Sequence, residues 1–446
     1  MTPVAAQDQP VRPEVSRESP PFPSGDDAAT RGLRSLYVPG GLTSDETVRR
    51  TLATSPDLER TRALVAEAKG ASLRAIGSLI PRLDLNASYT RFSRVFRPPQ
   101  FPLFLDNFST DATLGYSLTG SLAEALPSYR AAKKDKVASR HQIEAETNNV
   151  AFSAREAYYE FARSKAALGV ALKTLEEATS QRQETESLVA AGAAPRVDAM
   201  RTQAQVSAAQ VSVSQAELAL AVARRTLQTL MHVDSVPTLG EDLSRPVVGV
   251  PTESQEALEQ RALAERPDLK ALRTAVQATE HQIRAARGGA APDLLITGTA
   301  QYINPNPRVF PNEARFQATW DAGALVTWSP SDTFIAAGQA KQRKAELRRA
   351  VADIIALEDA IKVEVAEGYH GIFQAEAAWQ SARIGLQAAA ETYRIRRAQL
   401  RAGAVNTTDL LQAEAELTRA RLDVVDSAIG LRTAKATLLR AIGVQP

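Results

Sequence analysis

Two glycines of this sequence are each followed, six residues later, by an aspartate. Gly192 and Asp198 lie in AAGAAPRVDAM, and Gly403 and Asp409 lie in RAGAVNTTDLL. Glycine fits the left-handed position at which a helix ends, and proline, here Pro195, suits the first turn of the next helix. An acid in or near that first turn is stabilised by the helix dipole. The two stretches therefore predict bends between long helices, and this structural role is sufficient to account for both acids.

The other residues that could catalyse a reaction or bind a metal are few and scattered. The chain has no cysteine, which excludes disulfides, zinc–thiolate sites and a lipid-bearing N-terminal cysteine in the chain as given. Its four histidines are separated within helical patterns and never cluster: His141, His232, His281 and His370. We expect them to be ordinary helix residues rather than metal ligands or general bases.

Composition limits the classes of function. The 446 residues suffice for two or three ordinary domains or one extended architecture, and a net charge of +2 gives no electrostatic case for binding nucleic acid. No apolar run reaches the roughly 18 residues of a transmembrane helix, and the first residues lack the features of a signal peptide. The chain is therefore either cytosolic or numbered after a targeting segment was removed. For residues 1–41, rich in proline and polar residues, we expect an extended or disordered segment.

The sequence is a tandem duplication. Gly403 follows Gly192 by 211 residues, and other landmarks recur at the same displacement. Because the spacing survives without net insertion, we predict two repeats of one structural unit, at 42–233 and 253–446, joined by a linker at 234–252 with turn and short-strand composition. The matching landmarks are Pro56-Asp57-Leu58 with Pro267-Asp268-Leu269, Pro81 with Pro292, Leu83 with Leu294, and Tyr158 with Tyr369.

Each repeat carries the pattern of long helices. Apolar residues recur every seven positions on both sides of the second bend, and an alanine-rich stripe lies three residues further on. A sustained seven-residue repeat predicts left-handed supercoiling. A helix from about 334 to 401 would be roughly 100 Å long at 1.5 Å per residue. On the helices alone, a cytosolic coiled-coil scaffold is the favoured interpretation. The main stripe is Val365, Ile372, Trp379, Leu386, Tyr393 and Leu400, then Leu410, Leu417, Val424, Leu431 and Leu438.

Each repeat also contains two segments in which apolar and polar residues alternate. They lie at about 82–96 and 110–122, and at about 293–303 and 315–329. Alternation over roughly ten residues predicts strands with one apolar and one polar face, and the proline-rich stretches between them predict loops. Each repeat therefore carries one long hairpin. A hairpin half buried on a soluble core is one interpretation.

The length and composition of these strands favour a membrane instead. All four are about long enough to cross a bilayer, aromatic residues are spaced along the apolar face, and small hydroxylated residues line the polar face. Transmembrane barrels need about eight strands or more, and an open edge in lipid leaves backbone groups without partners. If these hairpins lie in a membrane, several chains must combine them, so we predict a homo-oligomer.

The order helix, hairpin, long helix, bend, long helix, repeated twice, resembles that of the TolC family of outer-membrane efflux proteins. The most specific elements are SPDL and RPDL opening the repeats, the proline before each first strand, and the AGA…D bends, above all RAGAVNTTDLLQAEAEL. The resemblance covers nearly everything after about residue 42. It implies a mainly α fold with a membrane β-barrel, in which a homotrimer pools four strands per chain into a twelve-stranded barrel. That barrel lies in the outer membrane of a Gram-negative bacterium and continues into a periplasmic tunnel of helices.

The resemblance also implies a role. Members of this family are exit ducts of tripartite efflux or type I secretion systems, in which an inner-membrane pump supplies energy and a periplasmic adaptor protein joins pump to duct. No chemistry is catalysed and no cofactor is needed, so we expect no enzyme, no cofactor and no metal site. A soluble coiled-coil scaffold is the alternative. An adaptor subunit would need lipoyl-like and small β-barrel segments, which the sequence does not show.

In the TolC family, the bends form the periplasmic mouth, and acids just beyond the second bend ring its narrowest point. Asp409 matches the first of these positions, whereas the second is Gln412, so the resemblance implies a single ring of charge. Three converging carboxylates repel one another unless screened, and they favour cations in the pore. Asp198 is the matching acid after the first bend. The family's locking tyrosine and arginine are replaced by Leu400 and Val405, so a closed mouth must be held differently or less firmly.

The tips of the bends resemble the surfaces on which adaptor hairpins dock in this family. Small residues help because they allow close approach of helices. The expected adaptor contacts are Ala191, Gly192 and Ala193 at the first bend and Ala402, Gly403 and Ala404 at the second.

Overall fold

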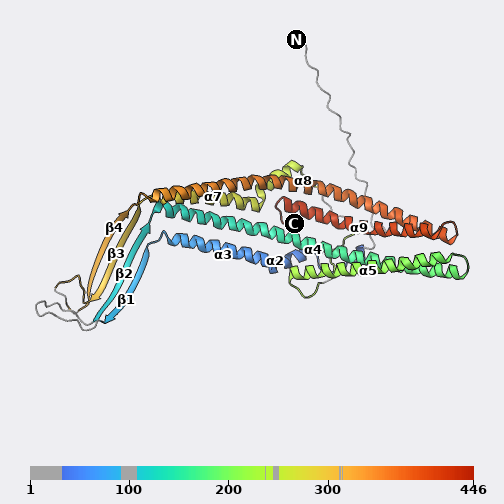
Figure 1. Cartoon of the computed structure of the whole chain (residues 1–446), viewed down its shortest axis with the longest axis horizontal. Helices are drawn as coiled ribbons and strands as arrows, with labels where there is room; N and C mark the ends of the chain where they lie inside the picture. Colours follow the sequence, from blue (N-terminus) through green and yellow to red (C-terminus); the bar gives the residue numbers. More distant parts are fainter. Residues whose placement is uncertain (1–32, 92–107, 237, 245–250, 311–312, 314) are drawn as a thin grey trace, which may run out of the picture.

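The computed structural model describes residues 33–91, 108–236, 238–244, 251–310, 313 and 315–446. The described chain is elongated, with two long helical hairpins side by side and a sheet at the end opposite the helical bends (Figure 1). Helices α4 (Leu122–Ala190) and α8 (Asp332–Arg401) run from the sheet to the two bends. The predicted fold class, mainly helical with four strands per chain, is confirmed.

The remaining elements occur in pairs. The first half contains α2 (Ser44–Thr54), α3 (Pro56–Gly77), β1 (Arg82–Arg91), β2 (Phe108–Gly120) and α5 (Arg196–Met231). The second half contains α6 (Gln255–Glu265), α7 (Pro267–Gly288), β3 (Asp293–Asn304), β4 (Gln317–Thr327) and α9 (Thr407–Ala441). The displacement of 211 residues separates the starts of α2 and α6, of α3 and α7, of β1 and β3, and of α5 and α9.

Local capping fixes where the short helices begin. The hydroxyl of Thr43 accepts a hydrogen bond from the backbone N–H of Glu46 at 3.2 Å, and the hydroxyl of Ser55 accepts one from Leu58 at 3.4 Å. Proline occupies the first position of both α3 and α7, where no intrahelical hydrogen bond is lost. The PDL motifs noted in the sequence are therefore helix starts.

The seven-residue stripes form the contacts between the long helices. All members of the main stripe are buried except Leu400, which is partly buried and packs against the same core. A Cβ placed on Gly368 of α8 would lie only 3.1 Å from the Cα of Leu438 on α9, so these helices approach closely. The predicted packing role of the stripes is confirmed.

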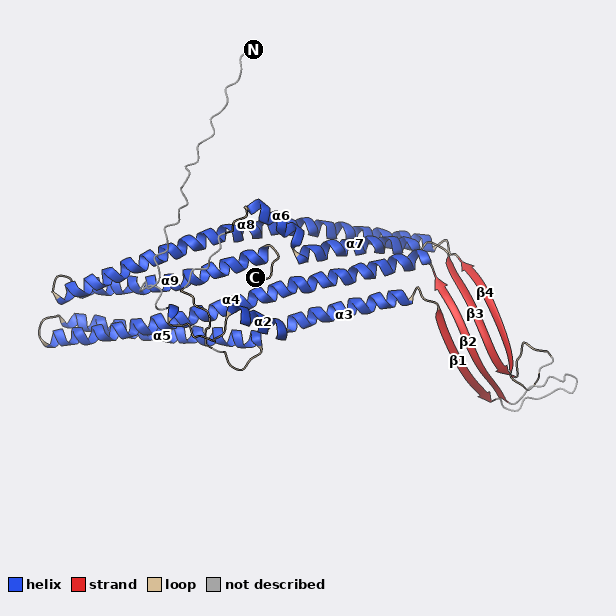
Figure 2. Ribbon diagram, turned by 180° about the vertical axis from the view of Figure 1, so that it is seen from behind, coloured by secondary structure: helices blue, strands red, loops and turns tan. Residues whose placement is uncertain are grey.

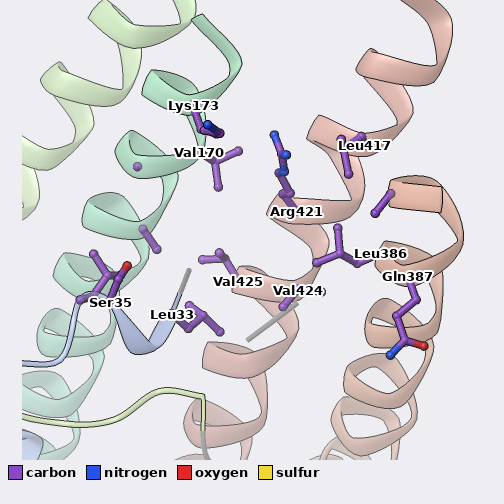
Figure 3. Close-up of a pocket in the computed structure, with 14 residues that line it drawn as sticks. Leu33, Ser35, Val170, Lys173, Leu386, Gln387, Leu417, Arg421, Val424 and Val425 are labelled. Carbon is purple, nitrogen blue, oxygen red and sulfur yellow. The ribbon is translucent and has the colours of Figure 1, made fainter. Parts of the chain in front are cut away.

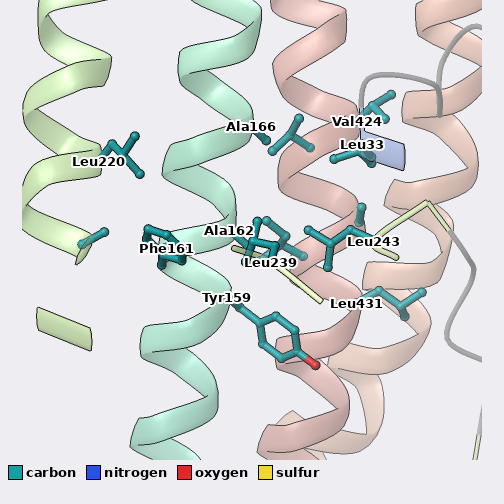
Figure 4. Close-up of a cluster of buried hydrophobic side chains, with 14 of the residues drawn as sticks. Leu33, Tyr159, Phe161, Ala162, Ala166, Leu220, Leu239, Leu243, Val424 and Leu431 are labelled. Carbon is teal, nitrogen blue, oxygen red and sulfur yellow. The ribbon is translucent and has the colours of Figure 1, made fainter. Parts of the chain in front are cut away.

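The largest apolar core lies at mid-length, where the linker crosses the long helices. Figure 4 shows Leu239 and Leu243 of the linker among side chains of α4, α5 and α9. The hydroxyl of Tyr158 donates to the carbonyl of Leu42 at 2.9 Å. Within the described part of the linker, the predicted short strand is reduced to one isolated parallel bridge between Leu42 and Leu239. Residues 237 and 245–250 of the linker lie outside the described part.

The four strands form one antiparallel sheet in the order β1-β2-β3-β4, shown in red in Figure 2. The two predicted hairpins are thus joined, because β2 pairs with β3 along its length. The register places Leu85 opposite Leu114, Leu114 opposite Ala300, and Ala300 opposite Trp320. Side chains of one face therefore stay on that face across the whole sheet.

The strand ends differ from the sequence prediction. β1 is described to Arg91, and the predicted positions 92–96 lie outside the described residues. The second strand is Phe108–Gly120 rather than 110–122, because Ser121 is already the N-cap of α4. β3 extends one residue beyond the predicted 293–303. The fourth strand is Gln317–Thr327 rather than 315–329, because the carbonyl of Ser329 accepts a hydrogen bond in the turn that leads into α8.

Candidate functional site

One face of the sheet is apolar and exposed. The row formed by Leu85, Leu114, Ala300 and Trp320 crosses all four strands, and neighbouring rows on this face are also apolar. Leu85 is 77% exposed and Trp320 is 78% exposed. Contiguous exposed apolar surface of this kind is rare on soluble monomers and marks a surface that meets lipid or another protein.

The opposite face is mainly polar, as the alternation predicts, and it is interrupted by Leu295, Ile303 and Leu325. It carries Asn86 and Ser88 on β1, Thr113 on β2 and Thr299 on β3. The hydroxyl of Ser88 donates to the carboxylate of Asp111, which lies directly opposite it. Within the described residues, β1 and β4 each lack a partner strand on their outer side. The sheet therefore has the two faces of a membrane barrel wall, and it has two open edges.

Both helical hairpins turn through the same backbone motif. Gly192 and Gly403 have φ angles of 72° and 71°, in the left-handed region that favours glycine. The N–H of Ala193 donates to the carbonyl of Leu188 at 2.8 Å, and the N–H of Gly192 donates to Val189 at 3.0 Å. This is a Schellman motif, and Gly403 and Ala404 form its counterpart at the second bend. The predicted role of both glycines as left-handed residues that end a helix is confirmed.

The tips of the bends are small and open to solvent. A Cβ added to Gly192 or Gly403 would meet no atom within 4 Å. Pro195 was expected in the first turn of the returning helix, but it is the N-cap of α5, with an extended ψ of 147°, so the helix begins at Arg196. The six predicted contact residues are all exposed: Ala191, Gly192, Ala193, Ala402, Gly403 and Ala404.

Asp409 caps the helix that follows the second bend. The Asn406 side chain accepts a hydrogen bond from the N–H of Asp409 at 2.9 Å, and the Asp409 carboxylate accepts one from the N–H of Asn406 at 3.4 Å. This capping box places the half-buried carboxylate at the positive end of α9. Gln412 is exposed one turn further on and donates to Glu416 at 3.1 Å.

Asp198 occupies the matching position after the first bend, but its surroundings differ. Its side chain is only 14% exposed, and its carboxylate lies 3.3 Å from Nη1 of Arg201. The same nitrogen lies 3.3 Å from the hydroxyl of Thr408 on α9. Asp198 is thus neutralised by an ion pair that also links the two bends. No salt bridge involves Asp409 within the part of the chain that the structure describes.

Ion pairs join the two hairpins close to the bends. Arg401, the last residue of α8, donates to Glu184 of α4 at 2.7 Å, and Arg397 lies 3.6 Å from the same carboxylate. The hydrogen bond from Arg401 lowers the pKa of Glu184. Arg421 of α9 pairs bidentately with Glu177 of α4 at 2.8 and 2.9 Å, and both side chains are largely buried. These contacts hold the second hairpin against α4.

The sequence did not reveal these pairs. Leu400 and Val405 implied that a closed mouth is held differently or less firmly than in the family. In the structure, arginines at other positions of α8 and α9 pair with acids of α4. Glu177 and Glu184 are seven residues apart, which places both on one face of α4. That spacing was the available signal. Their partners lie 244 and 217 residues away and could not be inferred from spacing.

A cavity of about 410 Å³ separates the hairpins beside the Arg421 pair. Its walls come from α4, α8, α9 and residues 33–36, and they are mainly apolar. Figure 3 shows Lys173 of α4 and Arg421 of α9 at one end of this cavity, and Leu386 of α8 further along it. Arg421 lines this cavity, so its ion pair with Glu177 lies at the edge of the space between the hairpins.

No group of side chains suited to holding a metal ion occurs within the residues described. His141, His281 and His370 lie within helices, and His232 is the C-cap of α5, with a φ of 52°. The sheet face and the two bends are therefore the candidate functional surfaces.

Comparisons with known proteins agree on one family and one fold. The sequence model of the outer membrane efflux protein family matches residues 47–231 and 258–444. The outer-membrane channel OprN has a TM-score of 0.77 at 19% identity, over 96% of this chain and 98% of that chain. The CmeC outer membrane channel of Campylobacter jejuni has a TM-score of 0.76 at 16% identity, over 90% of this chain and 85% of that chain. The outer membrane protein VceC of Vibrio cholerae has a TM-score of 0.75 at 18% identity, over 90% and 96%. No curated protein sequence matches the chain.

Proposed function

The chain belongs to the outer membrane efflux protein family, and we propose that three copies of it form one efflux channel. The family resemblance inferred from the duplicated motifs is thereby confirmed. The channel is the exit duct of a tripartite system. Its pooled sheets span the outer membrane, and its helical hairpins extend through the periplasm towards an adaptor and an inner-membrane pump. Family members are channels rather than enzymes, so the proposed activity is passage of a substrate.

The apolar face of the sheet is the observation that carries this proposal. Its strands have 10 to 13 residues, about the length that crosses a bilayer when tilted. The apolar residues lie in register over all four strands, and no helix that the structure describes covers them. For a coiled-coil scaffold in water, an exposed apolar face costs free energy. In a bilayer, lipid chains cover the same face and that cost disappears.

The open edges of the sheet support a homotrimer. A four-stranded sheet cannot close on itself in lipid, but three copies give a closed barrel of the size expected for this family. We propose that each copy contributes two similar units, 42–233 and 253–446, joined by the linker 234–252. The three chains together then supply six helical hairpins to the periplasmic tunnel.

Helix α5 offers a second surface for a neighbouring copy. By length and composition it is apolar enough to cross a membrane, but its core face packs inside the chain. Its exposed apolar residues lie opposite that buried face, which is typical of a helix packed between two neighbours. In the trimer, this stripe contacts an adjacent copy. The stripe comprises Val197, Met200, Val211, Leu218 and Val222.

The bends form the periplasmic mouth in this proposal. Asp409 from each copy lines the constriction, and Gln412 lies one turn beyond it. The carboxylate of Asp409 has no ion pair among the described residues, so its charge is uncompensated there. Asp198 contributes less charge because Arg201 neutralises it. The exposed tips contact the adaptor, and their small side chains allow its helices to approach closely.

Fractionation and conductance test the proposal together. The protein expressed in a Gram-negative host with a suitable targeting signal is expected in outer membranes, as a trimer that needs detergent for extraction. The purified trimer is expected to conduct ions in a planar bilayer, at a low level while the mouth is closed. A protein that stays soluble without detergent and fails to conduct would instead be the scaffold.

A further inference from the structure

Glu414 is a buried acid without a hydrogen-bond partner. It lies on α9, just over one turn beyond Asp409, and its residue is only 1% exposed. Neither of its carboxylate oxygens accepts a hydrogen bond within the described structure. Burying a carboxylate without hydrogen bonds is costly, and buried polar groups are normally paired. Neither the proposed constriction nor the ion pairs between the hairpins include this side chain, so its burial needs a separate explanation.

Charged and titratable groups face Glu414 from every helix around it. They are Glu177 of α4, Tyr393 and Arg397 of α8, and Arg421 of α9 itself. Both arginines are already engaged by acids of α4: Arg421 binds Glu177, and Arg397 lies beside Glu184. The cavity between the hairpins begins at Leu417, one turn further along α9. Glu414 therefore lies inside the contact that holds the second hairpin against α4.

The protonation state of Glu414 depends on that contact. Burial, reinforced by the charge of Glu177, raises the pKa of Glu414 from 4.5 to about 7, against the opposing effect of Arg421 and Arg397. When the second hairpin leaves α4, water reaches the carboxyl and its pKa returns towards the ordinary value. The packed state thus binds the proton more tightly. Its stability is greatest below about pH 4.5 and falls as the pH rises through about 7.

We propose that Glu414 is a proton-sensitive gating residue of the contact between the two hairpins. The protonated acid fits the packed arrangement, whereas the ionised acid favours separation of α8 and α9 from α4. An ionised Glu414 also competes with Glu177 and Glu184 for Arg421 and Arg397, the arginines that hold the hairpins together. The consequence for the mouth rests on the proposed channel function, but the effect on hairpin packing does not.

Conductance measures the consequence for the mouth. The full-length trimer is recorded in planar bilayers at pH 6 and pH 8. For the wild-type protein, the ratio of separated to packed hairpins is expected to rise about tenfold between these pH values, with a matching rise in open-channel current. Glu414→Gln, which is neutral in both arrangements, is expected to give a current at or below the wild-type pH 6 level at both pH values. Asp423→Asn, at an exposed acid of the same helix, is expected to keep the wild-type response.

Hydrogen exchange measures the packing itself. Amide exchange of residues 407–420, corrected for the intrinsic effect of pH, is expected to be about tenfold faster at pH 8 than at pH 6 in the wild-type trimer and equal at both in Glu414→Gln. A Glu414→Gln protein that keeps the wild-type pH response of exchange would overturn the proposal. If no variant conducts but exchange responds as expected, the channel function fails while the role of Glu414 stands.

Discussion

At the scale of single residues, the two acids that follow the bends share a sequence position but differ in chemistry. Asp198 is held by Arg201 and is largely buried, so its charge is compensated. Asp409 is half-buried, and among the described residues its carboxylate accepts a hydrogen bond only from the backbone N–H of Asn406, so it combines a capping role with an uncompensated charge. The sequence placed both acids in the first turn of a helix. The contact that distinguishes them is the ion pair from Asp198 to Arg201, three residues further on. The residue at the matching position after the second bend is Gln412, and this difference was a signal that the sequence offered.

Two substitutions at Asp409 separate its charge from its cap. Asp409→Asn keeps a side-chain oxygen for the capping box, whereas Asp409→Ala removes both the charge and the hydrogen bond. We expect both variants to weaken the cation preference of the channel, but only the alanine variant to destabilise the start of α9, by about 1 kcal/mol. Reversal potentials in a salt gradient measure the preference, and chemical unfolding measures the stability. An asparagine variant with the wild-type reversal potential would make Asp409 a helix cap only.

At the scale of elements, the sequence predicted the helices, bends and strands that occur in both halves. The displacement of 211 residues, the seven-residue stripes and the alternation in the strands correctly indicated both long hairpins, their glycine bends and four strands. It did not predict which elements pair. Alternation sets the face on which a side chain lies but not the neighbouring strand, so the pairing of β2 with β3 was missed. The same limit applies to the ion pairs, because heptads specify apolar contact and leave distant charged partners open.

The bidentate pair between Arg421 and Glu177 is expected to be the strongest polar contact between the hairpins. In Arg421→Met, Glu177 remains largely buried without its partner, so we expect the contact to weaken by ~2 kcal/mol and the open-channel current at pH 6 to rise. Arg401→Met should change the current less, because the Arg401 side chain is 59% exposed.

Two control variants test the origin of that effect. Arg419→Met, at an exposed position of α9, should leave the current unchanged. The double variant Glu177→Met with Arg421→Met should recover much of the lost stability, because no unpaired charge stays buried. If Arg421→Met and Arg419→Met give the same current, the ion pair does not hold the mouth.

At the scale of the whole molecule, the single chain leaves several surfaces without a partner. Within the described residues, its sheet has open edges at β1 and β4, and no helix meets the apolar face of the sheet. Helix α5 also exposes an apolar stripe along its length. Each of these features lies on a different part of the surface, and one assembly accounts for all three. In a ring of copies, β4 of one chain pairs with β1 of the next, lipid covers the apolar face, and α5 meets a neighbouring helix.

Cross-linking between edge strands tests this assembly directly, because the chain has no native cysteine to interfere. Ser88→Cys on β1 is combined in turn with Thr319→Cys, Gly323→Cys or Thr327→Cys on β4, all on the polar face of the sheet. A disulfide needs Cβ atoms about 4 Å apart, so only the pair that matches the register between copies will form one. That variant is expected to run as a covalent trimer in denaturing gels after oxidation, and the single-cysteine variants as monomers. In a closed ring of three, every chain is linked to two others. Cross-linked products that stop at the dimer, or that extend beyond the trimer, would contradict a closed ring of three chains.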